Sequence, residues 1–239
     1  MNPFSRSALG LAIAAALATQ SAQAATFNVT NTDDVGPGSF RQALIDANAN
    51  NEADTIELSS ISGQTIKLSS GQLSIQDDSI TINGSEVTLD AGRRSRVIYA
   101  VDTDYSENQI VINNLTITGG LTTKNDPTIL NSDRGLAGFG AGVLARGINV
   151  ELENVEIIGN ESFSGPGIYF VSQFGSMVLE DSIISGNKFC GNGALQIYGP
   201  NLEIEVNNST ISNNHFSSLF AGYGYDCIAA GAGIAVFVR

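Results

Sequence analysis

Residues 150–160 read VELENVEIIGN, and three other segments repeat this pattern: IVINNLTITGG at 110–120, MVLEDSIISGN at 177–187 and IEVNNSTISNN at 204–214. Asn154, Asp181 and Asn208 hold the same place in the last three copies, so these copies follow one another at a constant step of 27 residues. A repeat of this length is typical of a solenoid, because one copy cannot bury its own apolar face and must stack on its neighbours.

A second, glycine-rich motif lies between the copies. It reads GAGV at 140–143, GPGI at 165–168, GNGA at 191–194 and GAGI at 231–234. Each repeat unit therefore contains two strand segments that are separated by two turns.

Apolar and polar residues alternate inside each copy, which is the period of a strand. Val150 and Leu152 keep one phase, Val155 and Ile157 keep the other, and the phase slips at Asn154. We therefore expect these side chains to line one interior and the chain to bend at Asn154 and its equivalents. A helix is excluded here because no copy spaces its apolar residues by three and four.

Two turn positions follow the last apolar residue of each copy. The first holds only residue types that enter left-handed backbone conformations at low cost: Gly119, Gly159, Gly186 and Asn213. The second holds asparagines, which can bond to one another along the stacking axis. We expect the bend and turn residues to form structural ladders: Asn114, Asn154, Asp181, Asn208, Asn160, Asn187 and Asn214.

Residues 1–24 have the features of a secretory signal peptide. Arg6 provides the positive end, residues 8–18 form a short apolar run, and Ala-Gln-Ala at 22–24 fits a cleavage site. The run is too short to span a bilayer, and an uncleaved amphipathic anchor is the alternative. We expect an exported chain whose mature part, from residue 25, has no transmembrane span.

Residues 25–53 are expected to form an N-terminal cap that contains one amphipathic helix. Ser39 and Gln42 have the spacing of a capping box, and residues 48–51 end the helix. The apolar stripe of this helix needs a partner, so we expect it to cover the first turn of the solenoid rather than lie loose on the surface. The stripe consists of Phe40, Ala43, Leu44 and Ala47.

Residues 54–239 are assigned to the solenoid itself. Strands are expected at 56–58, 65–68, 73–75, 79–83, 87–90 and 97–101, and a polar insertion at 121–136 interrupts the repeat. The repeat is still in progress at Arg239, so we expect the array to be truncated there and to continue in a longer protein. The last rung should then expose three apolar side chains: Ile234, Val236 and Val238.

The segment GSFRQALIDANANNEADTIEL at 38–58, the glycine motifs and the Asn-Ser-Thr-Ile-Ser-x-Asn copy resemble a large group of bacterial secreted or surface proteins, and are similar to polymorphic outer membrane protein repeats. The resemblance implies an all-β fold, a right-handed single-stranded parallel β-helix like that of pectate lyases, with a short capping helix. It implies display outside the cell or on the outer membrane in an adhesin-like role, and it transfers no catalytic residue.

The formal net charge of −13 excludes a general affinity for polyanions. Nucleic acid and anionic lipid headgroups are therefore not expected as partners. The acidic side chains are expected to keep the solenoid soluble.

A search for catalytic groups finds little. His215 is the single histidine, and it follows a turn asparagine, so it is interpreted as a turn residue and not as a general base. A glycosidase needs two facing carboxyl groups, but the adjacent pairs in this chain have turn sequences, where aspartate bonds locally. These pairs are Asp33 with Asp34 and Asp77 with Asp78.

A polysaccharide lyase is the best enzymatic alternative, because it needs carboxylates that hold Ca²⁺ and a basic residue that takes a proton. The arginines of residues 93–96 form the one basic cluster, and we favour the interpretation that they solvate a turn and pair with surface acids. No cofactor is expected, with Ca²⁺ as the alternative. The candidate residues are Asp90, Asp102, Asp104, Glu107, Arg93, Arg94 and Arg96.

Cys190 and Cys227 precede two successive glycine motifs, which places them in the same turn of adjacent rungs. Rungs stack about 4.8 Å apart, and bridged Cα atoms are roughly 4.4 to 6.8 Å apart. A disulfide is therefore expected, and two free buried thiols are the alternative.

The sequence thus predicts an extracellular protein that binds a glycan or a cell surface and turns nothing over. A carbohydrate-active enzyme and a passive spacer in a longer passenger domain are the alternatives. The expected contact region is the insertion at 121–136 together with Tyr99, Tyr105 and the arginines at 93–96.

Overall fold

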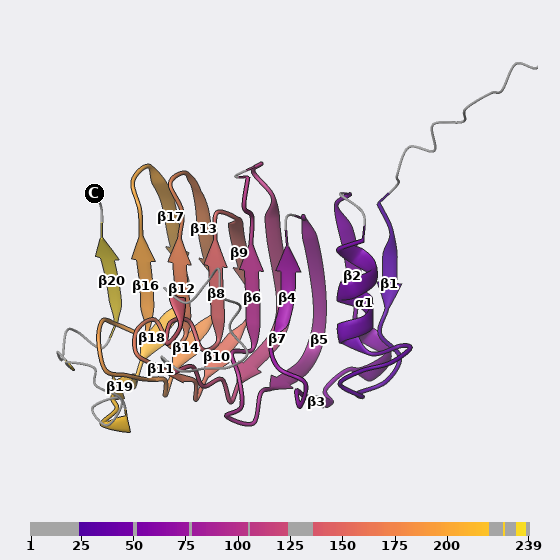
Figure 1. Ribbon diagram of the computed structural model, residues 1–239, viewed down its shortest axis with the longest axis horizontal. Helices are drawn as coiled ribbons and strands as arrows, with labels where there is room; N and C mark the ends of the chain where they lie inside the picture. Colours follow the sequence, from indigo (N-terminus) through magenta and orange to yellow (C-terminus); the bar gives the residue numbers. More distant parts are fainter. Residues whose placement is uncertain are drawn as a thin grey trace, which may run out of the picture.

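The computed structural model describes residues 24–49, 52–76, 78–104, 106–123, 136–219, 227 and 233–237. It is a parallel β-solenoid of about six turns with very little helix, which confirms the predicted parallel β-helix (Figure 1). Residues 1–23, which contain most of the predicted signal peptide, and residues 124–135 of the insertion lie outside the described part.

Within the described part, strands from successive turns stack into three parallel sheets. Sheet A contains β1 Thr26–Asn28, β2 Asp54–Glu57, β3 Thr65–Lys67, β5 Ile80–Asp90, β7 Gln109–Thr118, β9 Asn149–Glu153, β10 Glu156–Ile158, β13 Gly175–Glu180, β14 Ile183–Ser185, β17 Leu202–Asn207 and β18 Thr210–Ser212. Sheet B contains β4 Leu73–Gln76, β6 Ile98–Val101, β8 Val143–Arg146, β12 Ile168–Val171, β16 Leu195–Tyr198 and β20 Ile234–Phe237. Sheet C contains β11 Glu161–Ser162, β15 Lys188–Phe189 and β19 His215–Phe216.

Sheet A bends where the phase of the sequence slips. Asn114, Asn154, Asp181 and Asn208 have left-handed φ values of 53°, 52°, 48° and 45°, so the predicted corner is confirmed. At the equivalent corner of β5 the register shifts between Asn83 and Val87. The strands expected at 79–83 and 87–90 are therefore one bent strand.

The turn after the last apolar position is also left-handed. The φ angles of Gly119, Gly159, Gly186 and Asn213 are 68°, 67°, 63° and 53°. Other residue types would be strained at these angles, which explains why this column holds only glycine and asparagine.

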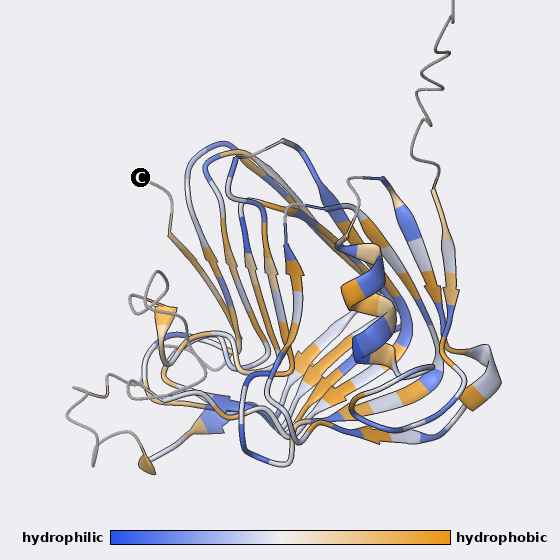
Figure 2. Ribbon diagram, turned by 45° about the vertical axis from the view of Figure 1, so that its right-hand side comes forward, coloured by the Kyte–Doolittle hydropathy of each residue, from blue (hydrophilic) through white to orange (hydrophobic). Residues whose placement is uncertain are grey.

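Apolar and polar residues alternate along the strands (Figure 2), and the apolar ones are buried as the predicted phase requires. Val150, Leu152 and Ile157 are buried in one continuous apolar core. Ser182 and Ser209 are polar exceptions in these columns. The Ser182 hydroxyl accepts a bond from Val155 N at 2.9 Å and donates to Glu180 O at 2.6 Å. An inward serine is therefore tolerated because its hydrogen-bonding groups are satisfied.

The glycine motif marks a close approach of neighbouring rungs. A Cβ atom added to Gly142 would lie 2.5 Å from Gly167 O and 2.8 Å from a methyl group of Ile157. Only glycine lets sheets A and B meet this closely at the turn.

The predicted helix is α1, Phe40–Ala47, and it contacts β1, β2 and β4 at the N-terminal end of the solenoid (Figure 1). Ser39 caps it by accepting a bond from Gln42 N at 3.2 Å, whereas the Gln42 side chain donates to Asp46 and not back to Ser39. Half of the expected capping box is therefore present. The four residues of the apolar stripe are all buried.

The opposite end of the described part is β20, which pairs with β16. Ile234 and Val236 are about half exposed, as expected for an uncovered rung, and Val238 lies outside the described residues.

Candidate functional site

A groove of about 420 Å³ crosses the turns that lead from sheet B into sheet A. These turns come before β7, β9, β13 and β17, so four successive rungs contribute to one elongated surface. Its lining combines one aromatic ring with amides, a hydroxyl group and carboxylates: Glu107, Gly147, Asn149, Phe174, Gly175, Ser176, Asn201 and Glu203.

The repeat places these residues in columns. Phe174 and Asn201 are one 27-residue step apart, and Ser176 is paired in register with Glu203 at the start of β13 and β17. Asn149 holds the equivalent place at the start of β9. A long ligand that follows the solenoid axis would therefore meet similar positions at every rung spacing of about 4.8 Å.

Local hydrogen bonds fix the polar wall of the groove. Asn149 Oδ1 accepts from Ser176 N at 2.8 Å, and Asn149 Nδ2 donates to Glu107 O at 3.2 Å. A Cβ atom on Gly175, whose φ is 122°, would lie 2.7 Å from Asn149 Oδ1. Glycine at this position is thus what allows the Asn149 amide to bridge two rungs.

The aromatic ring is held out into solvent. Phe174 is 62 % exposed, although its own backbone is fixed because the Ser172 hydroxyl donates to Phe174 O. A single exposed apolar side chain is common on a protein surface, so it is the position of Phe174 in the groove that makes it a candidate contact residue. The groove can stack an apolar ligand face on Phe174 and bond ligand hydroxyl groups through its amides and carboxylates.

The charge of the groove limits what it can accept. Glu107 and Glu203 are both exposed and acidic, and the lining contains no basic side chain. A polyanionic ligand would be repelled, whereas a neutral polyhydroxyl ligand can donate to these carboxylates.

The contact region predicted from the sequence is wrong for Arg96 and Tyr99, because both side chains are buried. Arg96 is buried and donates to Gly140 O at 2.8 Å, Phe139 O at 2.9 Å and Gln72 Oε1 at 2.7 Å. Its guanidinium lies 5.4 Å from the ring centroid of Tyr99, which is buried too. Both side chains are therefore committed to the fold, while Tyr105 and residues 124–135 lie outside the described part.

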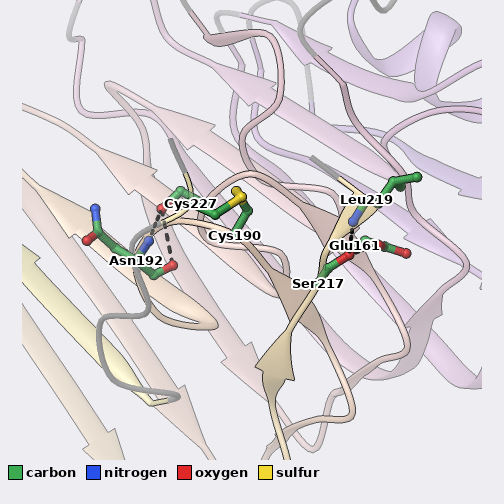
Figure 3. Close-up of a disulfide and its surroundings, with 7 residues drawn as sticks. Glu161, Cys190, Asn192, Ser217, Leu219 and Cys227 are labelled. Atoms are coloured by element: carbon green, nitrogen blue, oxygen red, sulfur yellow. Dashed lines mark hydrogen bonds between the residues drawn. A yellow bond between two sulfur atoms is a disulfide. The ribbon is translucent and has the colours of Figure 1, made fainter. Parts of the chain in front are cut away.

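Arg93, by contrast, pairs with an acid as expected. Its Nη2 atom lies 2.7 Å from Glu161 Oε2, but Glu161 is buried and not a surface acid. The hydroxyl of Ser217 also donates to Glu161 (Figure 3). This ion pair ties the turn after β5 to sheet C.

The candidate lyase residues do not form one site. Asp90 ends β5 and the arginines lie on the turn between β5 and β6, whereas Asp102, Asp104 and Glu107 lie on the turn after β6. The six residue steps from 96 to 102 separate the two turns by roughly 20 Å of extended chain. Asp102 instead closes its own turn by accepting from Asp104 N, Ser106 Oγ and Asn108 N.

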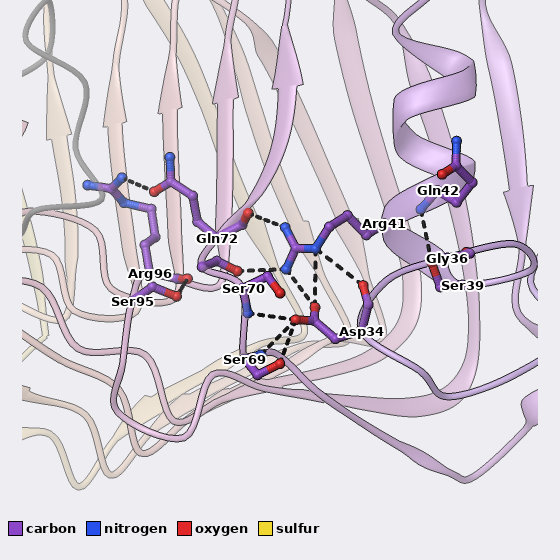
Figure 4. A network of polar contacts seen from close by, with 11 residues as sticks. Asp34, Gly36, Ser39, Arg41, Gln42, Ser69, Ser70, Gln72, Ser95 and Arg96 are labelled. Atoms are coloured by element: carbon purple, nitrogen blue, oxygen red, sulfur yellow. Dashed lines mark hydrogen bonds and ion pairs between the residues drawn. The ribbon is translucent and has the colours of Figure 1, made fainter.

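The candidate glycosidase carboxylates are also used locally. Asp34 binds Arg41 at 2.7 Å and accepts bonds from Ser69 and Ser70, which joins the turn before α1 to the next rung (Figure 4). Burial opposes ionisation of Asp34, yet the hydrogen bonds from Arg41, Ser70 and Ser69 lower its pKa to about 2. Asp78 is buried and accepts a bond from Ser79 N at 2.7 Å, and Asp77 lies outside the described residues.

His215 lies in a strand and not in a turn. It begins β19, next to Lys188 in sheet C, and its Nδ1 atom is 2.7 Å from Asn213 O. The turn interpretation is therefore wrong by one position, since the turn ends at Asn214.

The cysteines are joined in the structure. Cys190 and Cys227 form a disulfide with a Cα–Cα distance of 4.7 Å (Figure 3). Cys190 is fully buried beside the turn that Asn192 and Ser164 close with a 3.1 Å bond.

The turn asparagines form a continuous buried ladder. Asn160 N and Nδ2 both donate to Asn187 Oδ1, at 2.9 and 3.1 Å, and Asn187 makes the same two bonds to Asn214 at 3.0 and 3.1 Å. Gly120 N starts the ladder by donating to Asn160 Oδ1 at 2.8 Å. On the outside, Asn154 donates to Asn114 at 2.5 Å and Asn208 donates to Asp181.

The described residues contain no group of three or more His, Cys, Asp or Glu side chains placed to hold a metal ion. Among them there is also no helix whose length and hydropathy would allow it to cross a bilayer.

Comparison of the whole chain with models of protein families, with curated proteins and with solved structures finds no match. The groove is therefore interpreted from its own residues.

Proposed function

We propose that this chain is exported, is released from its signal peptide after Ala24, and binds a neutral glycan in the groove at Phe174 without turning it over. The observation that carries the binding proposal is the 62 % exposed ring of Phe174 inside a groove lined by amides and carboxylates. The export signal at residues 1–24 and the resemblance to secreted and surface β-helix proteins support an extracellular or outer-membrane location.

Absence of turnover is proposed because the aspartates that the sequence offered as catalytic candidates, Asp34 and Asp102, are engaged in local hydrogen bonds. Asp34 and Asp102 close turns, and the arginines of residues 93–96 are distant from Asp102 and Glu107 along the rung. A binding groove needs only shape, a stacking surface and hydrogen-bonding groups.

A glycan array followed by titration with the best ligand tests the proposal. The Phe174→Ala variant should bind roughly tenfold or more weakly, because truncating a central aromatic contact costs about 2 kcal/mol. Phe216→Ala is the matched control. Phe216 is another exposed phenylalanine, but it lies on β19 of sheet C and does not line the groove. This control should bind like the wild-type chain.

Salt concentration separates a neutral glycan from a basic ligand. Binding to a neutral glycan should change little between low and high salt, whereas attraction of a basic surface to the acidic groove would be screened. Equal affinity of Phe174→Ala and wild type, or binding that salt abolishes, would contradict the proposal. Absence of binding to any glycan or cell surface would favour a passive spacer, and release of unsaturated products from polyuronates with Ca²⁺ would favour the lyase.

A further inference from the structure

Three carboxylates gather inside the N-terminal end of the solenoid. Asp54 opens β2 and is 1 % exposed, and Asp78 precedes β5 and is 2 % exposed. Asp54 is paired with Ile80 and shares the inward phase of Ile56, so its side chain points into the core and not to the surface. Glu52 lies half-buried beside them. Burying acidic side chains in this way is costly unless a positive group or several donors compensate.

Asp78 is incompletely compensated. Its Oδ1 atom accepts from Ser79 N at 2.7 Å, but its Oδ2 atom is fully buried and has no hydrogen-bond partner. Burial, together with the nearby charges of Asp54 and Glu52, raises the pKa of Asp78 to about 6. An orphaned carboxylate oxygen in a buried acidic cluster indicates that a donor or cation belongs there.

The backbone nitrogen of Ala25 lies at this cluster. Ala25 N donates to Asp54 Oδ1 at 2.6 Å, and Ala25 O accepts from Thr55 N at 2.9 Å. The second bond extends the pairing of β1 with β2 and holds the nitrogen in place. Ala25 is also the first residue after the expected cleavage site.

We propose that the acidic cluster is the binding site for the mature N-terminus, an α-ammonium group that arises only when the Ala24–Ala25 bond is cut. Hydrolysis by a peptidase consumes one water, leaves a carboxylate on Ala24 and leaves an ammonium on Ala25. This inference rests on the export proposed above. The amide of the uncut chain offers one N–H, whereas the ammonium offers three and a positive charge.

The ammonium explains why the acids are buried. One of its N–H groups keeps the bond to Asp54, and the others are available to the orphaned oxygen of Asp78 and to Glu52. Charge-assisted bonds of this kind are about twice as strong as neutral ones. Removal of the signal peptide therefore completes the first turn of the solenoid, and the uncut chain carries an unpaired buried acid in its place.

Three forms of the mature chain test this site: residues 25–239 with a free amine, the same chain with the amine acetylated, and a chain that begins at Ala24. The last keeps the positive charge but moves it one residue, about 3.8 Å, along the chain. Urea unfolding at pH 7 should give the free-amine form a folding equilibrium constant roughly ten- to a hundredfold above both other forms. Asp54→Asn should remove most of this advantage, and Asp78→Asn provides a second variant if Asp54→Asn does not fold.

The pH profile gives a signature that a merely structural role of Asp54 would not produce. In the acetylated form Asp78 binds its proton more tightly when folded, so stability should fall as the pH rises from about 4 to about 6. The free-amine form should not lose stability over this range. Its stability advantage over the acetylated form should disappear above the pKa of the amine, about 8 or higher.

The two proposals fail separately. Equal stability of the free-amine, acetylated and Ala24 forms would overturn the ammonium site, whatever the cell does with the precursor. N-terminal sequencing of the exported protein tests the cleavage, and a mature chain that does not begin at Ala25 would overturn the processing step.

Discussion

Substitution of Asn187 by alanine should destabilise the solenoid more than any exposed asparagine substitution. Asn187 is completely buried and sits in the middle of the ladder. Its oxygen accepts from Asn160 N, and its Nδ2 atom donates to Ile157 O at 2.8 Å and to Asn214 Oδ1. Alanine would leave the buried Asn160 N–H without an acceptor and would remove the bond to Ile157 O.

The expected loss in the free energy of unfolding is about 3 kcal/mol. An orphaned buried donor costs about 1 to 3 kcal/mol, and each further lost bond contributes about 1 kcal/mol. Asn207→Ala is the matched control, because it makes the same chemical change on the exposed end of β17. A surface change of this kind should stay within about 0.5 kcal/mol.

Urea unfolding followed by far-ultraviolet circular dichroism measures both variants against the wild type. The midpoint of Asn187→Ala should fall clearly below that of Asn207→Ala at an unchanged slope. Equal midpoints for the two variants would refute the reasoning, because the ladder would then contribute nothing beyond an exposed amide.

Three other changes have defined outcomes. Ile157→Asp should prevent folding because it buries an unpaired charge, whereas Glu156→Lys on the exposed face should shift the thermal midpoint little; equal losses would contradict the assigned phase. Thiol labelling of the unreduced, denatured chain should find no free thiol, and reduction of the bond between Cys190 and Cys227 should cost up to about 4 kcal/mol; two labelled thiols would refute the bridge. Asp34, whose folded pKa of about 2 is below its ordinary value, should contribute roughly 2 kcal/mol above pH 4 that is lost as the pH falls toward 2, so Asp34→Asn should flatten the acid limb of the stability curve.

The fold could be predicted because a solenoid repeats its physical constraints at every rung. The inward phase of Val150 and Ile157, the bend at Asn154 and the glycine column each appear several times in the sequence, so one copy tests the interpretation of another. The left-handed turn at Asn213 follows from the same column of residue types.

The burial of Arg96 could not be predicted from the repeat. No other rung has an arginine at the equivalent position, which is Ala141 in the next rung, so nothing in the sequence marks Arg96 as buried. The acceptors that make its burial possible are the carbonyl oxygens of Phe139 and Gly140, more than 40 residues away. Such partners become visible only when the chain has folded, and a basic cluster therefore looked like a solvated turn.

The groove was not predicted, although the sequence contains a pattern that indicates it. Asn149, Ser176 and Glu203 follow one another at the 27-residue step, one position before the first apolar residue of their copies. A search confined to conspicuous clusters overlooked these residues because each of them is unremarkable alone.

The two proposed sites lie where the repeat is broken in opposite ways. In the groove, Phe174 replaces a turn residue that is glycine one rung earlier and asparagine one rung later, which puts an apolar ring where solvent should be. At the N-terminal end, Asp54 puts a charge in the interior column that Ile80 and Ile110 continue, and Asp78 is buried near it. The exposed ring lacks the free energy that its burial would supply, and the buried acids cost free energy unless an ammonium group is present. In a chain whose other columns follow the solenoid pattern closely, such paired violations are the positions where function is expected to reside.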